Sequence, residues 1–271
     1  MFDKSKKGKQ YTPLDEEPFL KRLIIYIAAL FMALFLTIGQ SVVVFTGQYE
    51  VSISILIFLI VIFVYYCFGW ILLNLWKSTT DYAHSKVFKG NFTKSAITNL
   101  LLALLVSLIF HFIIMILPIN KVSNDVELNV YLLVVLFVFQ VLVAPFIEEV
   151  VVRGLFLSMF FKKKLNIFNF SIKQEIVLRL TFAILISAFT STILHGMSAP
   201  ISVLSLLLNG VLCAILYISS KHILTPILFH MINNLFAWSG LLLILIKWKL
   251  SIFVKSYYLN ENCIYNNICL V

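Results

Sequence analysis

Seven stretches of this chain are apolar enough and long enough to cross a lipid bilayer. They occupy residues 23–46, 51–76, 97–118, 128–161, 176–199, 200–220 and 222–246, and each ends at charged residues, proline or glycine. A helix needs about 20 apolar residues to span a hydrocarbon core of roughly 30 Å. Because 61% of the 271 residues are hydrophobic and only 12% are charged, the soluble-enzyme classes are excluded. We therefore predict an all-α fold, a polytopic membrane helix bundle of seven or eight transmembrane helices.

The basic residues predict the orientation of this bundle. Lysine and arginine cluster before the first stretch, after the second and after the fourth, and alternate loops are nearly free of them. The positive-inside rule then predicts a multi-pass protein of the cell membrane with a cytoplasmic N-terminus. The net charge of +9 has the same explanation, since the basic residues form short clusters and not a patch interleaved with aromatic residues. We expect no nucleic-acid partner.

Four regions follow from this pattern. Residues 1–22 are predicted to be a cytoplasmic basic tail, 23–127 the N-terminal transmembrane helices, and 128–246 a helical core that carries the polar motifs described below. Residues 247–271 are either a C-terminal tail or a shallow eighth segment near 249–259, because this tail carries lysines although it should face outward.

The fourth stretch is too long for one straight crossing and has Pro145 in its middle. Proline removes a backbone donor from a helix and bends or breaks it. Irregular backbone at membrane depth is tolerated where it lines a cavity. We therefore predict a kink or a break at Pro145, beside a cavity.

Ionisable residues inside these stretches are the functional candidates, because such groups are costly in a membrane. The first group is Glu148-Glu149-Val150-Val151-Val152-Arg153. Glu149 and Arg153 share a helix face, so the guanidinium can neutralise that carboxylate. Glu148 points about 100° away and is left to accept a proton from water. The alternative interpretation of the Glu-Arg spacing is a purely structural ion pair.

Two further groups contain histidine: His195 on the fifth stretch, and His230 with Asn234 on one face of the seventh. A carboxylate base, imidazoles that orient water or stabilise an oxyanion, and an amide donor are the parts that amide hydrolysis requires. Taken singly, a transmembrane His or Asn more often bonds a neighbouring helix, and we interpret His111 in that way. The coincidence of three groups on three stretches favours a site.

The depths of these residues must agree if they share a site. Counting about 1.5 Å per residue from the cytoplasmic helix ends, Glu148 lies roughly 20 Å deep and His230 roughly 14 Å deep. His195 lies about 24 Å from Arg179 by the same count. The fifth stretch must therefore tilt, or Arg179 must snorkel, for the three side chains to converge.

These groups resemble the motifs of the CPBP family, the CAAX-prenyl-protease and bacteriocin-processing membrane proteins. The motifs of that family are Glu-Glu-x-x-x-Arg, Phe-x-x-x-His and His-x-x-x-Asn, and here they fall on Glu148, Glu149, Arg153, His195, His230 and Asn234. The resemblance covers residues 128–238 roughly, so 128–246 is the CPBP-like catalytic core. It departs at Ser191, which stands at the Phe position although Phe189 is close by. This difference concerns the shape of the pocket more than its chemistry.

The resemblance implies an intramembrane endopeptidase that acts on a peptide or a membrane-tethered protein, with membrane lipid as its other partner. It implies that Glu148 activates the attacking water with help from His195. It also implies that His230 and Asn234 stabilise the oxyanion. Glu149 with Arg153 would hold the architecture.

No cofactor is expected. Two His and two Glu could ligate zinc, but the usual pair of zinc ligands on one helix is missing from the sequence. We therefore predict a site without a metal ion.

Two other functions are left open by the sequence. One is a catalytically silent membrane scaffold or immunity protein of the same fold, against which the full set of motifs argues. The other is a small transporter with a proton-relay carboxylate. Such transporters often have repeated halves and broken helix pairs, and only Pro145 fits that description.

Overall fold

A computed structural model describes residues 12–46, 51–79, 94–116, 130–161, 171–195, 200–220 and 222–240, with residues 242, 243, 246 and 250. Within these ranges the chain is almost wholly helical and contains no strand, as the predicted all-α fold requires. Six helices are long and apolar enough to cross a membrane, over Phe19–Phe45, Val51–Lys77, Lys94–Ile114, Val130–Phe160, Lys173–Leu194 and Val203–Ser220. The chain is thus a multi-pass membrane protein. A seventh crossing stays a prediction, as does an eighth near 249–259, which lies almost entirely outside the described residues.

The helices follow one another in this order: η1 (Leu14–Glu16), α1 (Phe19–Thr46), α2 (Val51–Lys77), α4 (Lys94–Ile116), α5 (Val130–Leu136), η2 (Phe137–Val143), α6 (Ala144–Glu149), η3 (Val150–Leu155), α7 (Phe156–Phe160), α8 (Ile172–Leu194) and α9 (Pro200–Ser220). Residues 224–240 form a further helix, the 224–240 helix. The division into four regions stays a prediction.

The start of α8 is fixed by a local sequence motif at its N-terminus. Ser171 and Gln174 form a capping box, in which the Ser171 hydroxyl accepts the Gln174 N–H at 3.4 Å and the Gln174 side-chain oxygen accepts the Ser171 N–H at 3.1 Å. The helix therefore begins before the expected residue 176. It ends at Leu194, so that His195 directly follows its last turn. The expected continuation over 196–199 lies outside the described residues.

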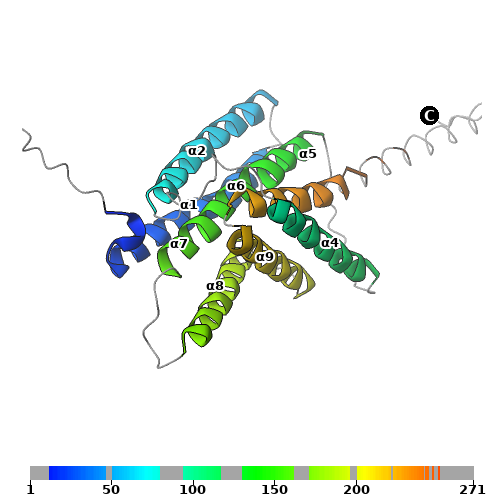
Figure 1. Ribbon diagram of the computed structural model, residues 1–271. Coiled ribbons are helices and arrows are strands. Elements are labelled where there is room, and N and C mark those ends of the chain that lie inside the picture. The colour runs from blue at the N-terminus through cyan, green and yellow to red at the C-terminus, as the bar shows by residue number, and fades with distance from the viewer. Residues whose placement is uncertain are drawn as a thin grey trace, which may run out of the picture.

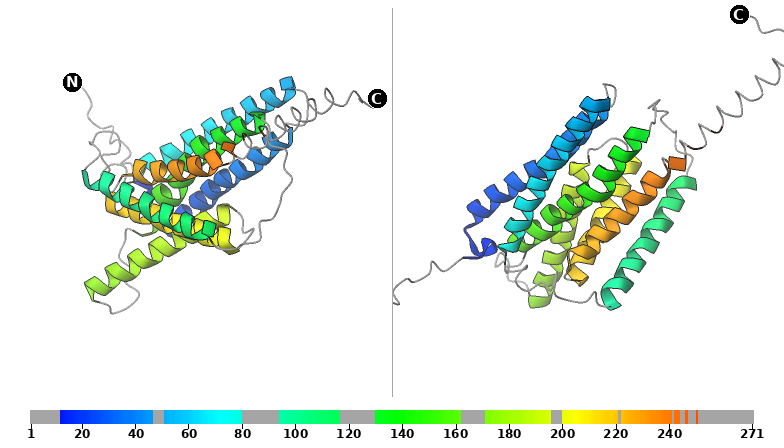
Figure 2. Two further views of the ribbon diagram at one scale, coloured as in Figure 1. Left: turned by 90° about the vertical axis from the view of Figure 1, so that its right-hand side faces the viewer. Right: turned by 90° about the horizontal axis from the view of Figure 1, so that it is seen from above.

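The helices are arranged around the run from α5 to α7. In two views, α2, this run, the 224–240 helix and α4 lie side by side (Figure 1, Figure 2). On one side of this row α8 and α9 meet at an angle, and α9 packs against both α8 and α4 (Figure 1). Large apolar side chains such as Phe63, Trp70 and Phe112 are exposed. In a bilayer these side chains face lipid.

Residues 130–160 form one helical run in which α5, α6 and α7 alternate with two π-helical stretches, η2 and η3. At the end of η2 the Ala144 N–H bonds to the Phe139 carbonyl, five residues back. In this register the Gln140 carbonyl faces Pro145, which has no N–H. The Asn234 side chain donates to that carbonyl at 2.6 Å. The interruption expected at Pro145 is therefore a change of hydrogen-bond register. The Gln140 carbonyl, which this change leaves without a backbone partner, is satisfied by Asn234 of the 224–240 helix.

Two helices approach almost backbone to backbone where Gly210 of α9 meets Ala188 of α8. A Cβ on Gly210 would lie 2.8 Å from the Ala188 Cα and 3.1 Å from its carbonyl oxygen. Small residues at helix contacts permit such close packing in membranes. The contact fixes the last two turns of α8, which carry Ser191 and lead to His195.

Substitution of Gly210 by alanine tests this contact. Gly210→Ala should destabilise the protein by about 1–3 kcal/mol, because the two backbones must separate to admit the methyl group. The measurement is thermal unfolding of the purified protein in detergent. Gly240→Ala is the matched control, since a Cβ there meets no atom within 4 Å. It should unfold at or slightly above the wild-type temperature, because alanine is the better helix former. The same unfolding temperature for both variants would contradict the close contact.

Candidate active site

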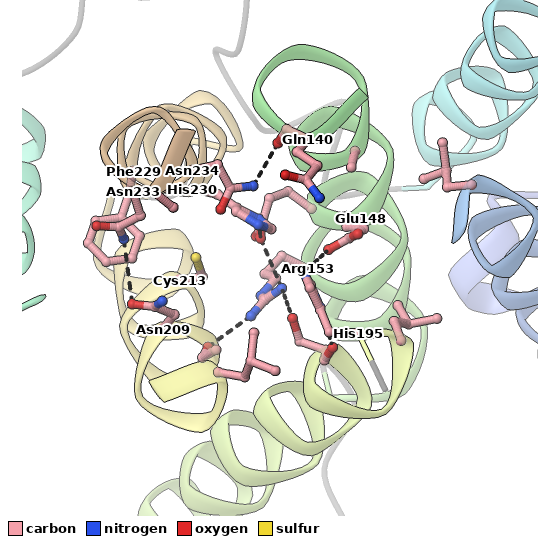
Figure 3. A pocket seen from close by; sticks show the side chains of 18 of the residues that line it. Gln140, Glu148, Arg153, His195, Asn209, Cys213, Phe229, His230, Asn233 and Asn234 are labelled. Atoms are coloured by element: carbon pink, nitrogen blue, oxygen red, sulfur yellow. Dashed lines mark hydrogen bonds and ion pairs between the residues drawn. The ribbon is translucent and has the colours of Figure 1, made fainter. Parts of the chain in front are cut away.

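Arg153 is fully buried in η3 and joins three helices. Its Nη1 lies 3.0 Å from Glu149 Oε1 and 3.4 Å from the Ser191 hydroxyl of α8. Its Nη2 donates to the Gly210 carbonyl of α9 at 2.9 Å. A buried guanidinium is tolerated only when it is paired and hydrogen-bonded. The i,i+4 pair expected from the sequence is therefore present, and it fixes the run from α5 to α7 against α8 and α9 (Figure 3).

Glu149 also binds His230 from the 224–240 helix. Its Oε1 lies 3.0 Å from His230 Nδ1, and the carboxylate is fully buried. A carboxylate oxygen accepts, so the hydrogen of this bond belongs to Nδ1. The other ring nitrogen, Nε2, is left for the cavity. Glu149 therefore orients the imidazole in addition to balancing the charge of Arg153.

His195 is oriented in a similar way by the backbone of α8. Its Nδ1 lies 2.8 Å from the Ser191 carbonyl oxygen, which can only accept a hydrogen bond. Its Nε2 lies 3.5 Å from Glu148 Oε2. That oxygen is buried and has no hydrogen bond to any described residue. The free nitrogen of His195 and the free oxygen of Glu148 thus point at one another across a short gap.

Glu148, His195 and His230 converge although they come from three helices. One donor atom of each lies within 4.8 Å of the others, and the two imidazole centroids are 5.9 Å apart. They line a cavity of about 390 Å³, together with residues of α1, α9 and the 224–240 helix. The difference in depth counted from the sequence does not separate them, because His195 stands at the end of α8 where this helix meets the other two.

Asn234, the last of the six motif residues, lines the same cavity. One N–H of its carboxamide is used by the Gln140 carbonyl at 2.6 Å. A carboxamide has a second N–H and a carbonyl oxygen. Asn234 is therefore both a link between two helices and a wall of the cavity (Figure 3).

Ser191 takes a part in the site that its position in the motif did not indicate. Its side chain contacts Arg153 and its carbonyl holds His195. Phe189, which is close to the motif position in sequence, is 57% exposed and so does not fill the pocket. Where the family has a phenylalanine, this chain thus has a small polar residue bonded to the central arginine.

A second polar cluster beside the cavity was missed by sequence reasoning. The Ser107 hydroxyl of α4 lies 3.0 Å from Asn233 Oδ1 and 3.3 Å from Asn209 Oδ1 of α9, and either oxygen can accept its one hydrogen. His111 lies 2.8 Å from the Ser107 carbonyl and 3.3 Å from the Ser205 hydroxyl, which agrees with its interpretation as a contact between helices. Isolated Ser and Asn residues follow no spacing rule, so the sequence offered no signal for this cluster beyond their polarity.

The three converging donors also have the composition of a zinc site. One carboxylate and two imidazoles leave a fourth position for water, as in catalytic zinc sites. Both imidazoles use Nδ1 for a second bond and leave Nε2 free, which is the usual arrangement of zinc-bound histidines. The side chains therefore fit a metal ion as well as a directly held water molecule.

Residues 130–236 match the family model Rce1-like, described as type II CAAX prenyl endopeptidase Rce1-like. A search of curated proteins gives no match, and neither does a search of solved structures. The matched segment contains every motif residue, from Glu148 to Asn234. The comparison thus agrees with the resemblance of the motifs: over residues 130–236 the chain matches the Rce1-like family of type II CAAX prenyl endopeptidases.

Proposed function

We propose that this chain is an intramembrane endopeptidase that hydrolyses a peptide bond of a membrane-associated peptide or protein. The observation that carries the proposal is the convergence of Glu148, His195 and His230 on one cavity among helices apolar enough to span a membrane. The match to the Rce1-like model supports it, because that family is described as endopeptidases.

In the proposed reaction a water molecule lies between Glu148 and His195. His195 holds Nδ1–H against the Ser191 carbonyl, so its neutral Nε2 accepts a hydrogen bond from this water. Glu148 takes a proton from the water as the water oxygen attacks the carbonyl carbon of the scissile bond. The same proton passes to the leaving nitrogen as the C–N bond breaks. Glu148 is thereby restored as a carboxylate.

Negative charge develops on the former carbonyl oxygen, and His230 and Asn234 are the proposed donors to it. His230 donates through Nε2 when its ring carries both protons, and the Glu149 carboxylate on Nδ1 stabilises that charged form. Asn234 donates through the N–H that the Gln140 carbonyl does not use. Glu149 and Arg153 act on the reaction only through the residues that they hold.

We propose further that water is activated without a metal ion. Zinc sites often take two ligands from one helix, one turn apart. One turn after His230 the 224–240 helix has Asn234, and an amide is a poor zinc ligand. If zinc were present, Glu148, His195 and His230 would hold it, and the ion would polarise the attacking water. The base would then be Glu149.

The proposed substrate approaches from the cytoplasm. The positive-inside distribution of lysine and arginine predicts a cytoplasmic N-terminus, and with that orientation the run from α5 to α7 ends on the cytoplasmic side at Phe160. A membrane-tethered peptide reaches the cavity from that side without leaving the bilayer surface.

Replacement of the proposed base gives the main test. The assay uses purified protein in lipid nanodiscs and a quenched-fluorescence library of acylated peptides with randomised sequences. Glu148→Gln should lower the cleavage rate by at least about 100-fold, because it removes the group that takes the proton. It should leave the amount of folded protein unchanged, since Glu148 Oε2 has no hydrogen bond to a described residue.

The control for this test is Glu175→Gln, which removes a carboxylate from the first turn of α8, away from the cavity. This variant should cleave like the wild type. A wild-type protein that cleaves no peptide of the library, or a Glu148→Gln variant that keeps full activity, would overturn the proposed function.

Chelation tests the metal-free mechanism. Cleavage by the purified protein should survive incubation with a strong chelator, and metal analysis should find no stoichiometric zinc, because the proposed water is held by protein atoms alone. Loss of activity in the chelator, recovery with one equivalent of zinc, and zinc in the untreated protein would together contradict this. They would make Glu148, His195 and His230 zinc ligands.

A further inference from the structure

The cavity wall contains a carboxamide that the proposed reaction does not use. Gln140 of η2 lines the cavity, and its side chain points into it near Glu148 and Asn234 (Figure 3). Its backbone carbonyl is bonded to Asn234, but its side-chain carboxamide has no hydrogen bond to any described residue. The carboxamide is thus available to a molecule that enters the cavity.

The neighbouring carboxamides are not available in the same way. Asn209 and Asn233 bind Ser107 and one another. Asn234 is partly used by the Gln140 carbonyl. A polar side chain in an apolar helix normally finds such a partner, because an unpaired polar group in a membrane is costly. The Gln140 side chain instead faces the cavity, where its carboxamide can bind a molecule that enters.

The backbone carbonyl of Gln140, inside the π-helical stretch η2, is bonded to a side chain of the neighbouring 224–240 helix. Pro145 cannot supply an N–H to the Gln140 carbonyl, and the 2.6 Å bond from Asn234 replaces it. This bond couples the position of Gln140 to the helix that carries His230. The backbone from which the Gln140 side chain enters the cavity is therefore tied to the helix that carries His230 and Asn234.

We propose that Gln140 is a substrate-binding residue whose carboxamide pairs with a peptide group of the substrate main chain. A carboxamide has one donor side and one acceptor side, which match the carbonyl and the N–H of an extended peptide. Gln140 precedes Glu148 by eight residues, or about 12 Å along the helix axis. An extended peptide rises by about 3.3–3.6 Å per residue, so the paired group lies within about four residues of the scissile bond. This assignment rests on the proposed peptidase function and adds to it the binding of the main chain.

The test separates binding from chemistry. The probe is the best-cleaved peptide of the acylated library, made in versions with a single N-methyl group on each amide near the scissile bond. Gln140→Met should raise KM about tenfold and change kcat less than about twofold, because the bond is made equally to substrate and transition state. In the wild type one N-methylated position should raise KM by a similar factor. In Gln140→Met that same position should have no further effect.

Two other variants serve as controls: one removes only the N–H donor of residue 140, and the other removes a carboxamide away from the cavity. Gln140→Glu keeps the shape and an acceptor oxygen but has no N–H, so it should raise KM while the N-methyl penalty stays. Asn99→Met removes a carboxamide that binds Ser219 away from the cavity, and it should behave like the wild type. Two results in a cleaving wild-type background would overturn the assignment of Gln140 and leave the peptidase function standing. One is a Gln140→Met variant with the wild-type KM. The other is a Gln140→Met variant with a raised KM in which every N-methylated position still raises KM further. If the wild type cleaves no peptide, the peptidase function itself has failed and the assignment falls with it.

Discussion

The buried pair of Glu149 and Arg153 is the interaction on which the candidate site depends. Each side chain is fully buried, and each makes a second bond to another helix: Arg153 to Ser191 and Gly210, and Glu149 to His230. A buried ion pair contributes little net stability, but the loss of one partner leaves a charge that nothing balances. The pair therefore brings four helices together at one point: the run from α5 to α7, α8, α9 and the 224–240 helix. Glu148, the residue immediately before Glu149 in the chain, lies at that meeting point.

A second constraint comes from Pro145, and it acts on the same helices. The proline changes the hydrogen-bond register of the helical run and leaves the Gln140 carbonyl without a backbone partner. Asn234 satisfies this carbonyl from the helix that also carries His230. The carbonyl left unpaired in one helix is thus satisfied by a hydrogen bond from a second helix. In membrane proteins irregular backbone is tolerated where it is buried in protein or lines a cavity, and here both conditions hold. The hydrogen bond from Asn234 therefore lies at the cavity wall, to which Gln140 belongs.

The sequence was sufficient for the six membrane-length helices and for the convergence of Glu148, His195 and His230, because these depend on apolar length and on the rarity of charges in a bilayer. The seventh and eighth crossings stay predictions. The sequence also contained the capping box of Ser171 and Gln174, a signal by which the true start of α8 could have been found. The bonds of Ser191 to Arg153 and of Asn234 to Gln140 could not be predicted, because hydrogen bonds between helices depend on the rotation and depth of each helix. The same holds for Ser107, Asn209 and Asn233, whose spacing in the chain carries no information about their contact.

Thermal unfolding of a double-mutant cycle on Glu149 and Arg153 tests most directly whether this pair holds the site together. Arg153→Met should destabilise the protein by about 3–5 kcal/mol, because it strands the buried Glu149 carboxylate. The double variant Glu149→Gln/Arg153→Met should be less destabilised than the sum of its two single variants, since no unpaired charge is left. Additive effects, or an Arg153→Met variant that unfolds at the wild-type temperature, would contradict the account.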